Sequence, residues 1–249
     1  MLKHLFVLAA VAAAAAPACA LGTGDLAFTS VNADEDGFSV VTFVDIAAGT
    51  KVFFTDNEFV GGAFNMSESY SSWTSGAAQV AAGTVIRFSQ VDVATLSASV
   101  GTLVRETVSG STNWGLSTAA DTVYAYLGST ATAPTTFVAA ITNSSFNTTD
   151  GALAGTGLVE GTTAMRLRTT GSPDYGVYNG VRSGLARFAG YQPRVANVAN
   201  WTVDTTDGNY MTTVPDTTAF SITAVPEPES YALILAGLAG LAYVARRRA

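Results

Sequence analysis

Short runs rich in Val, Ile, Phe, Tyr and Thr recur along the chain, and Gly, Asn, Asp or Ser residues separate many of them. Runs of this length between turn-forming residues are typical of β-strands, whereas a surface helix needs a longer pattern with a period of 3.6 residues. The pattern therefore predicts an all-β fold. The predicted strands are Asp25–Ser30, Gly37–Asp45, Lys51–Asp56, Thr84–Ser89, Leu103–Val108, Asp121–Leu127 and Thr136–Ile141.

The segment Gly37–Asp45 is apolar on both of its alternating faces, which predicts a central strand. Residues 21–224 suffice for one sizeable core, so we expect a single antiparallel β-sandwich of jelly-roll or immunoglobulin-like type. The less regular parts are predicted as short helices at Val91–Ser99 and Val195–Trp201, a long loop at Phe146–Gly161 and a last strand at Thr217–Thr223.

The first residues have the pattern of a secretory signal peptide. Lys3 supplies a positive start, Leu5–Ala16 is apolar, and Ala18 and Ala20 form a small-residue cleavage site. We expect a helical signal peptide over residues 1–20, which signal peptidase removes.

The only His, His4, and the only Cys, Cys19, both lie in this signal peptide. The mature body therefore has no side chains for a Ser-His-Asp triad, a Cys-His nucleophile or a His/Cys zinc site. This predicts a protein that is not an enzyme and has no resident cofactor. Cys19 raises the alternative of a lipoprotein, although Ala16 stands where such signals usually carry Leu.

The body is acidic and sparsely charged. Between residues 21 and 226, twelve Asp and five Glu stand against seven Arg and one Lys, a net charge of −9. Nucleic-acid binding depends on basic clusters that neutralise phosphates, and the body has none. We therefore expect no nucleic-acid partner.

The C-terminal residues 225–249 have three parts. Val225, Pro226, Glu227 and Pro228 form a hinge that the prolines keep extended, Tyr231–Ala245 is uncharged and apolar, and Arg246, Arg247 and Arg248 follow. The apolar run predicts a transmembrane helix of about 22 Å, short for a hydrocarbon core of about 30 Å. The arginines predict a cytoplasmic end. This segment could be a permanent single-pass membrane anchor, or it could be a tail that a protease removes after export.

This order of hinge, short apolar helix and arginine cluster resembles the PEP-CTERM sorting signal of Gram-negative bacteria. The resemblance implies that an exosortase in the inner membrane cleaves near the Pro-Glu-Pro. The expected product is a non-enzymatic protein of the outer surface or extracellular matrix, associated with exopolysaccharide and biofilm. Its precursor is expected in the inner membrane only transiently.

Several segments of the body resemble a lamin-tail-like β-sandwich module of bacterial secreted and surface proteins. This resemblance implies an extracellular module and carries no catalytic residues. The segments are Gly24–Phe28, Val44–Thr50, Phe54–Asn57, Ala81–Ile86, Asp174–Gly180 and Ala199–Thr202.

The segment Asn32–Gly37 is a candidate calcium loop. Asn32, Asp34 and Asp36 place oxygen ligands at alternate positions before a Gly, as calcium loops do at their start. The twelfth position is Phe43 rather than the bidentate Glu of an EF-hand. A solvated hairpin turn is the alternative.

The segment from Asp56 to Trp73 carries the alternative function, a carbohydrate-binding module or a carboxylate-based glycoside hydrolase. A glycosidase needs two carboxyl groups on either side of the scissile bond, and aromatic rings would stack on sugars. The acids are Asp56, Glu58 and Glu68, and the aromatic residues are Phe59, Phe64, Tyr70 and Trp73.

Overall fold

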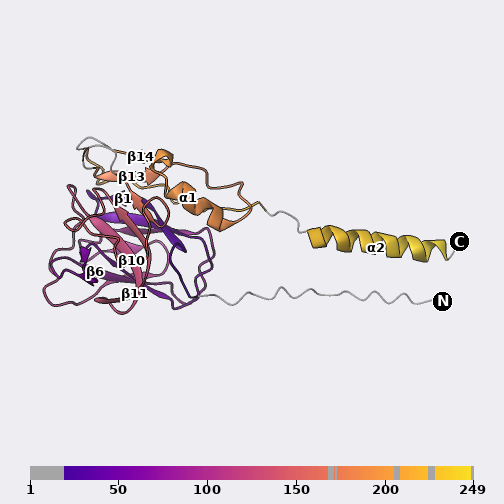
Figure 1. Cartoon of the computed structure of the whole chain (residues 1–249), viewed down its shortest axis with the longest axis horizontal. Coiled ribbons are helices and arrows are strands. Elements are labelled where there is room, and N and C mark those ends of the chain that lie inside the picture. Colours follow the sequence, from indigo (N-terminus) through magenta and orange to yellow (C-terminus); the bar gives the residue numbers. More distant parts are fainter. Residues whose placement is uncertain (1–19, 168–170, 172, 205–207, 224–227, 248–249) are drawn as a thin grey trace.

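The computed structural model describes residues 20–167, 171, 173–204, 208–223 and 228–247. These residues form two six-stranded sheets, a small two-stranded sheet, short helical turns and a C-terminal helix (Figure 1). The prediction of a mostly β protein with antiparallel sheets is confirmed.

The first sheet is antiparallel throughout. Its third and fourth strands are the most deeply buried, and all six residues of the fourth, β2, are buried. The prediction that this strand is central is therefore confirmed. The spatial order is β14 (Trp201–Val203), β13 (Tyr175–Tyr178), β1 (Leu26–Asn32), β2 (Gly37–Thr42), β7 (Val85–Ser89) and β8 (Ser97–Ala98).

The second sheet is antiparallel except at one edge, where β12 pairs in parallel with β11. Like the first sheet, it ends on both sides in strands of only two to four residues. The spatial order is β12 (Ala164–Arg166), β11 (Ala133–Thr142), β10 (Thr122–Thr130), β3 (Lys51–Thr55), β6 (Tyr70–Thr74) and β9 (Thr102–Arg105).

Aromatic side chains join the two sheets across a common core. Phe38 and Phe88 of the first sheet lie 5.0 and 4.9 Å from Phe54 of the second, measured between ring centroids. Trp73 of the second sheet meets Phe88 edge-on at 6.3 Å. Because these rings belong to one cluster of buried residues, the two sheets pack face to face as a sandwich.

The outer face of the second sheet carries a separate aromatic cluster. The two-stranded sheet of β4 (Phe59–Val60) and β5 (Ala63–Phe64) covers it. The ring of Phe64 lies 5.2 Å from that of Tyr126 and 5.8 Å from that of Phe137. This cover explains why side chains on both faces of the second sheet are buried.

All seven predicted strands are present, with boundary shifts of up to three residues. The pattern missed β6 and β13, among others, for a common reason. Ser71 and Ser72 in β6 and Gly176 in β13 are residues of low strand propensity, and neighbouring strands rather than local preference fix them in the sheet.

The predicted helix at Val91–Ser99 is wrong. The segment makes consecutive turns, in which Val93 N donates to Gln90 O and Leu96 N to Val93 O, and then enters β8. Gln90 has a positive φ of 55°. A nine-residue helix is marginal without an apolar face to bury, so edge pairing with β7 is preferred.

The predicted helix at Val195–Trp201 is confirmed only in part. Short helices occupy Phe188–Tyr191 (η1), Gln192–Val195 (α1) and Val198–Asn200 (η2), and Trp201 already belongs to β14. The Asn197 side chain accepts a hydrogen bond from Ala199 N, which starts a new turn and interrupts a continuous helix.

The predicted last strand, Thr217–Thr223, makes only an isolated bridge between Ile222 and Leu185. Its backbone donors bind residues outside any regular strand pairing: Phe220 N donates to Gly83 O, Ser221 N to Arg182 O and Thr223 N to Leu185 O. The predicted loop Phe146–Gly161 contains no strand in the described structure, which agrees with the prediction.

The C-terminal helix α2 runs over Pro228–Arg246 and covers the predicted transmembrane segment Tyr231–Ala245. A search of the described chain for a helix with the length and apolar character needed to cross a bilayer finds none. The helix itself is confirmed, and its prediction as a transmembrane helix is not.

Candidate functional site

Helix α2 presents its apolar side chains to solvent and stands apart from the two sheets (Figure 1). Seven large apolar residues between positions 233 and 244 are 50 to 74 % exposed. No atom outside the helix backbone lies within 4 Å of an added Cβ at Gly237 or Gly240. A helix with exposed apolar residues on all sides needs an apolar partner or environment.

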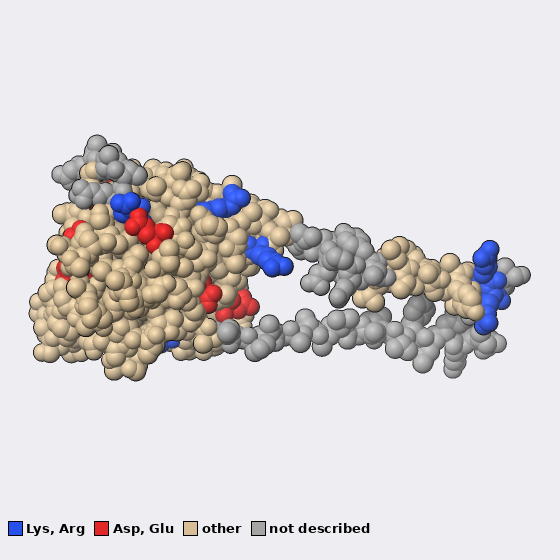
Figure 2. All heavy atoms as spheres, viewed as in Figure 1, with Lys and Arg blue, Asp and Glu red and all other residues tan. Residues whose placement is uncertain are grey.

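The predicted sorting residues fall partly within the described chain. Pro228 begins α2, where the missing N–H of proline costs no helical hydrogen bond. Arg246 ends the helix, and the guanidinium of Arg247 lies 5.1 Å from the ring centroid of Tyr243. Figure 2 shows this basic end far from the body. Val225, Pro226, Glu227 and Arg248 lie outside the described residues.

Most of the predicted signal peptide, including Ala18, also lies outside the described residues. Ala20 is the first described residue and is exposed. Leu21 directly after it is 4 % exposed and belongs to the core between the sheets. Among the described residues, the core therefore begins at Leu21, directly after the predicted cleavage site.

The candidate calcium loop lies at the β1–β2 hairpin, where its three side chains bind backbone groups. Asn32 Nδ2 donates to Tyr210 O at 2.9 Å, and Asp34 Oδ2 accepts from Tyr210 N at 2.7 Å. Asp36 Oδ1 accepts from Leu116 N at 2.6 Å. These bonds tie the hairpin to two distant segments. Calcium binding at Asn32, Asp34 and Asp36 stays a prediction.

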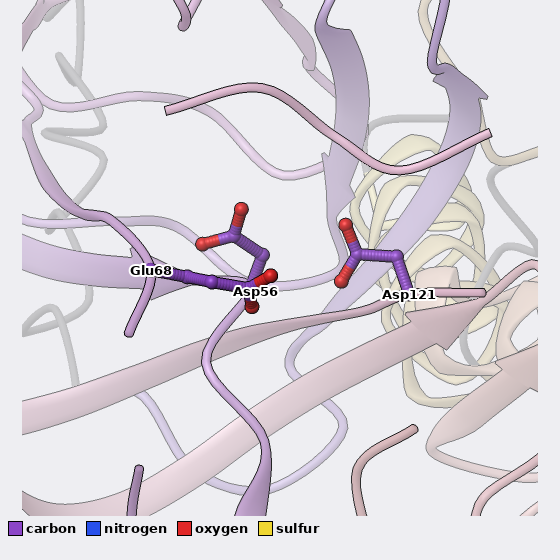
Figure 3. Close-up of side chains that lie close together, drawn as sticks. All are labelled: Asp56, Glu68 and Asp121. Atoms are coloured by element: carbon purple, nitrogen blue, oxygen red, sulfur yellow. The ribbon is translucent and has the colours of Figure 1, made fainter. Parts of the chain in front are cut away.

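A cluster of acids forms where three strands of the second sheet meet. Strand β3 is antiparallel to both β6 and β10, so its end lies beside their beginnings. Asp56 follows β3, Glu68 lies two residues before β6, and Asp121 immediately precedes β10. Sheet topology therefore brings together residues that are far apart in sequence, which we name the acidic triad (Figure 3).

Strand alternation points two members of the acidic triad into the sandwich. Asp56 lies two residues after Phe54 and Asp121 two residues before Val123, both of which face the core. Asp56 is 3 % exposed and Asp121 9 %, while Glu68 is half-buried. One carboxylate oxygen from each residue lies within 4.8 Å of the others.

Hydrogen bonds fix two of the three carboxyl groups. Asp56 Oδ1 accepts from Ser69 N at 3.2 Å and from Ser69 Oγ at 3.0 Å. Asp121 accepts from Ser117 N at 2.9 Å and from Thr122 N at 2.7 Å. Asp56 Oδ2 and Glu68 Oε2 are buried without a hydrogen-bond partner.

Burial and mutual repulsion shift the titration of the acidic triad. Burial raises the pKa of Asp56 to about 7, against the hydrogen bonds from Ser69 that lower it. Burial and the charge of Asp56 raise the pKa of Glu68 to about 8. The same two causes raise the pKa of Asp121 well above its ordinary value. Holding three negative charges here is therefore unfavourable unless a cation compensates them.

The space beside the acidic triad is small. A cavity of about 20 Å³ touches Asp56 and one of about 10 Å³ touches Asp121, and Leu116 lines both. A space of this size holds about one water molecule. The described arrangement has no room for a sugar ring between the carboxyl groups.

The four aromatic residues that the alternative function needed do not form an exposed stacking surface near these acids. The side chains of Phe59, Phe64, Tyr70 and Trp73 are at most 8 % exposed, so they are core residues rather than a stacking surface. Their rings meet other buried rings, as where Phe64 meets Tyr70 edge-on at 6.0 Å. The aromatic-rich sequence reflects the two-layered packing of the second sheet.

A separate hollow of about 620 Å³ lies between the β12 edge and α1. The ion pair of Glu160 and Arg166, at 2.7 Å, lies in its wall. None of the described residues that line it is aromatic, and aromatic rings are the usual stacking surface of a sugar site.

Sequence reasoning singled out Asp56 and Glu68 but missed Asp121 as their partner. The signal was present at the strand boundaries, because Asp56 ends one predicted strand and Asp121 begins another. Using it requires knowing that these strands are antiparallel neighbours, which the sequence pattern alone does not specify.

Comparison with known protein families identifies one region. The family described as the PEP-CTERM protein-sorting motif matches residues 224–248. The motif implies export through the cell envelope of a Gram-negative bacterium and processing by an exosortase. No curated protein and no solved structure matches the chain significantly. The lamin-tail-like resemblance of the body therefore stays a prediction.

Proposed function

We propose that this chain is a non-enzymatic β-sandwich protein that is delivered to the outer surface or extracellular matrix, where it associates with exopolysaccharide. Its tail holds the precursor briefly at the inner membrane before an exosortase cuts near Pro226–Pro228. The body, from Leu21 to the hinge, is the part that is delivered.

The match of the sorting motif to residues 224–248 is the observation that carries this proposal. The geometry of the tail supports it, because α2 exposes its apolar residues and ends in Arg246 and Arg247. In the part of the chain that the structure describes, Phe220 is the last buried core residue before the helix, and the three residues that follow it are exposed.

The body supports a non-catalytic role through its composition and packing. It lacks His and Cys, and Asp56 and Asp121, two of its three clustered carboxylates, are buried beside spaces for single water molecules. Signal peptidase is the expected partner at the N-terminus, since Leu21 is the first core residue after the predicted cleavage site.

Intact mass spectrometry of the surface-located protein tests the sorting step. In a host with its exosortase, the mass is expected to end near the Pro-Glu-Pro and to lack Arg246–Arg248. In an exosortase deletion strain, the precursor is expected to keep the whole tail and to remain in the inner-membrane fraction.

A variant with Pro226→Ala and Pro228→Ala serves as the matched control, because it alters the hinge and leaves the apolar run and arginines unchanged. It is expected to accumulate as precursor even when exosortase is present. Surface protein that still carries the terminal arginines in the exosortase-positive host would show a permanent anchor instead.

Binding to exopolysaccharide is tested separately with the processed protein. Co-sedimentation with exopolysaccharide from the same host is expected to retain it, whereas polysaccharide from a strain with a different repeat unit is expected to retain less. If the protein sediments equally with both polysaccharides, or with neither, the proposed association is contradicted. The sorting result is unaffected by this outcome.

A further inference from the structure

We propose that Asp56, Glu68 and Asp121 bind one calcium ion at the end of the second sheet. This site is distinct from the β1–β2 hairpin, and it does not depend on how the tail is processed. It would fix the three segments that meet there.

The distances in the acidic triad suit a calcium ion. Calcium binds oxygen ligands at about 2.3–2.6 Å, so two ligands on opposite sides of the ion lie about 4.8 Å apart. One oxygen each from Asp56, Glu68 and Asp121 falls within 4.8 Å of the other two. These distances are therefore compatible with a single ion that all three carboxylates contact after small side-chain adjustments.

Unpartnered oxygens provide an independent indication of a ligand. Asp56 is 3 % exposed, its Oδ1 is held by Ser69, and its Oδ2 has no hydrogen-bond partner. Glu68 Oε2 is also buried and unpartnered. A buried carboxylate oxygen without a donor is costly, and metal coordination removes that cost.

The hydrogen bonds that do exist hold ligands in place. Ser69 fixes one oxygen of Asp56 and leaves the other available, as outer partners of metal ligands commonly do. The backbone N–H groups of Ser117 and Thr122 orient Asp121, since each donates to a different oxygen of its carboxylate. Two of the three carboxylates are thus oriented before an ion binds.

No protein cation compensates the acidic triad in the part of the chain that the structure describes. The four ion pairs found there join Lys51 to Glu106, Arg87 to Glu35, Arg166 to Glu160 and Arg182 to Asp216. The repulsion among the three carboxylates is therefore relieved either by protonation or by a bound divalent ion.

The donor set favours calcium over other metals. All three ligands are hard carboxylate oxygens, and the body has neither His nor Cys, which zinc and copper prefer. Magnesium usually keeps several waters, but the adjoining cavities of about 20 and 10 Å³ hold about one each. Half-buried Glu68 provides the side from which the ion enters.

Thermal unfolding of the full-length chain in detergent tests the site, in calcium chloride and in chelator at neutral pH. The wild type is expected to melt several degrees higher in calcium, because an ion that binds only the folded state stabilises it. Glu68→Gln, which removes a ligand charge, is expected to lose this response. Titration calorimetry with calcium should show its Kd raised at least about tenfold.

Glu58→Gln is the matched control, since Glu58 lies close enough to raise the pKa of Glu68 but is not one of the three ligands. It should keep the calcium response. Asp34→Asn tests the hairpin in the same assay and should also keep it. A wild-type melting temperature that is equal in calcium and chelator overturns the proposal. Loss of the response in Asp34→Asn with retention in Glu68→Gln overturns it as well.

Discussion

At the scale of single residues, Gly83 is fixed by both conformation and space. Its φ is +86°, and an added Cβ would lie 2.3 Å from Phe220 O. Gly49 has a similar φ of +74° but nothing within 4 Å of an added Cβ. The two positions therefore separate backbone strain from steric conflict.

We expect Gly83→Ala to destabilise the fold by more than about 2 kcal/mol, because the cost of a left-handed backbone conformation adds to the cost of the steric clash. Gly49→Ala should cost about 1 kcal/mol from strain alone. Urea denaturation of both variants measures the difference. If both variants lose the same unfolding free energy, the segment that carries Phe220 moves away from the new methyl group at no energetic cost.

The acidic triad predicts a specific pH dependence in chelator. The pKa of Asp56 rises from 3.8 to about 7 and that of Glu68 from 4.5 to about 8, so the folded state holds protons that the unfolded state has lost. Their contribution to stability is complete below about pH 4 and is lost as pH rises to about 8. The loss is measured as the difference in unfolding free energy between about pH 5 and about pH 8, from denaturation in chelator.

Glu106 and Asp216 act in the opposite direction, because their pKa values are lowered. The comparison with Glu68→Gln isolates the acidic triad, since that variant should lose less stability between about pH 5 and pH 8 than the wild type. A steeper loss in Glu68→Gln would contradict the raised pKa of Glu68.

At the scale of elements, the β4–β5 hairpin acts as the cover of the outer aromatic cluster. Phe64 is 8 % exposed and its ring packs against Phe59 at 5.2 Å, whereas Val60 on the same hairpin is 40 % exposed. The stability of this cover should depend on the inward ring rather than on the turn.

Phe64→Ala is expected to cost about 3–5 kcal/mol of unfolding free energy, the usual range for a buried Phe. Val60→Ala should cost less than about 1 kcal/mol. Tryptophan fluorescence during denaturation, with Trp73 in the core, measures both. Similar losses for the two variants would mean that the hairpin does not cover the sheet.

The agreement or conflict between local strand preference and position in the sheet explains which strands the sequence predicted and which it missed. Strands such as β2 and β10 are rich in β-branched and aromatic residues between turns, so local preference and tertiary position agree. Strand β6, with two serines, takes its conformation from β3 and β9 on either side. Pairing between distant strands is not visible in local pattern.

The same reasoning applies to the candidate sites. The sorting residues lie within one short segment, so their resemblance to a known signal is visible in the sequence, and the family match covers the same segment. The acidic triad joins Asp56, Glu68 and Asp121 across 65 positions of sequence, and only the antiparallel order β10-β3-β6 makes them neighbours. Its prediction required the topology as well as the residues.

At the scale of the whole molecule, Phe220 is the last core residue in the described chain. Phe220 is 3 % exposed and contacts the rings of Tyr191 at 5.1 Å and Tyr178 at 5.7 Å. The guanidinium of Arg182 covers it at 4.9 Å. The three residues after it are exposed.

A chain that stops at Thr223 should therefore unfold at the same temperature as the full-length chain. Phe220→Ala should lose about 3–5 kcal/mol of unfolding free energy, because it empties a buried aromatic site. Calorimetry of the shortened chain and of Phe220→Ala, each compared with the full-length wild type, checks both expectations. A lower melting temperature for the shortened chain would show that the tail contributes to the fold.

Both sheets end in strands of two to four residues: β14 and β8 in one, β12 and β9 in the other. An edge this short offers few free backbone groups to a strand from another molecule. Neighbouring copies can therefore be crowded together at high concentration without merging into a continuous sheet. Each copy would remain a separate folded particle at concentrations where longer edges would seed fibrils.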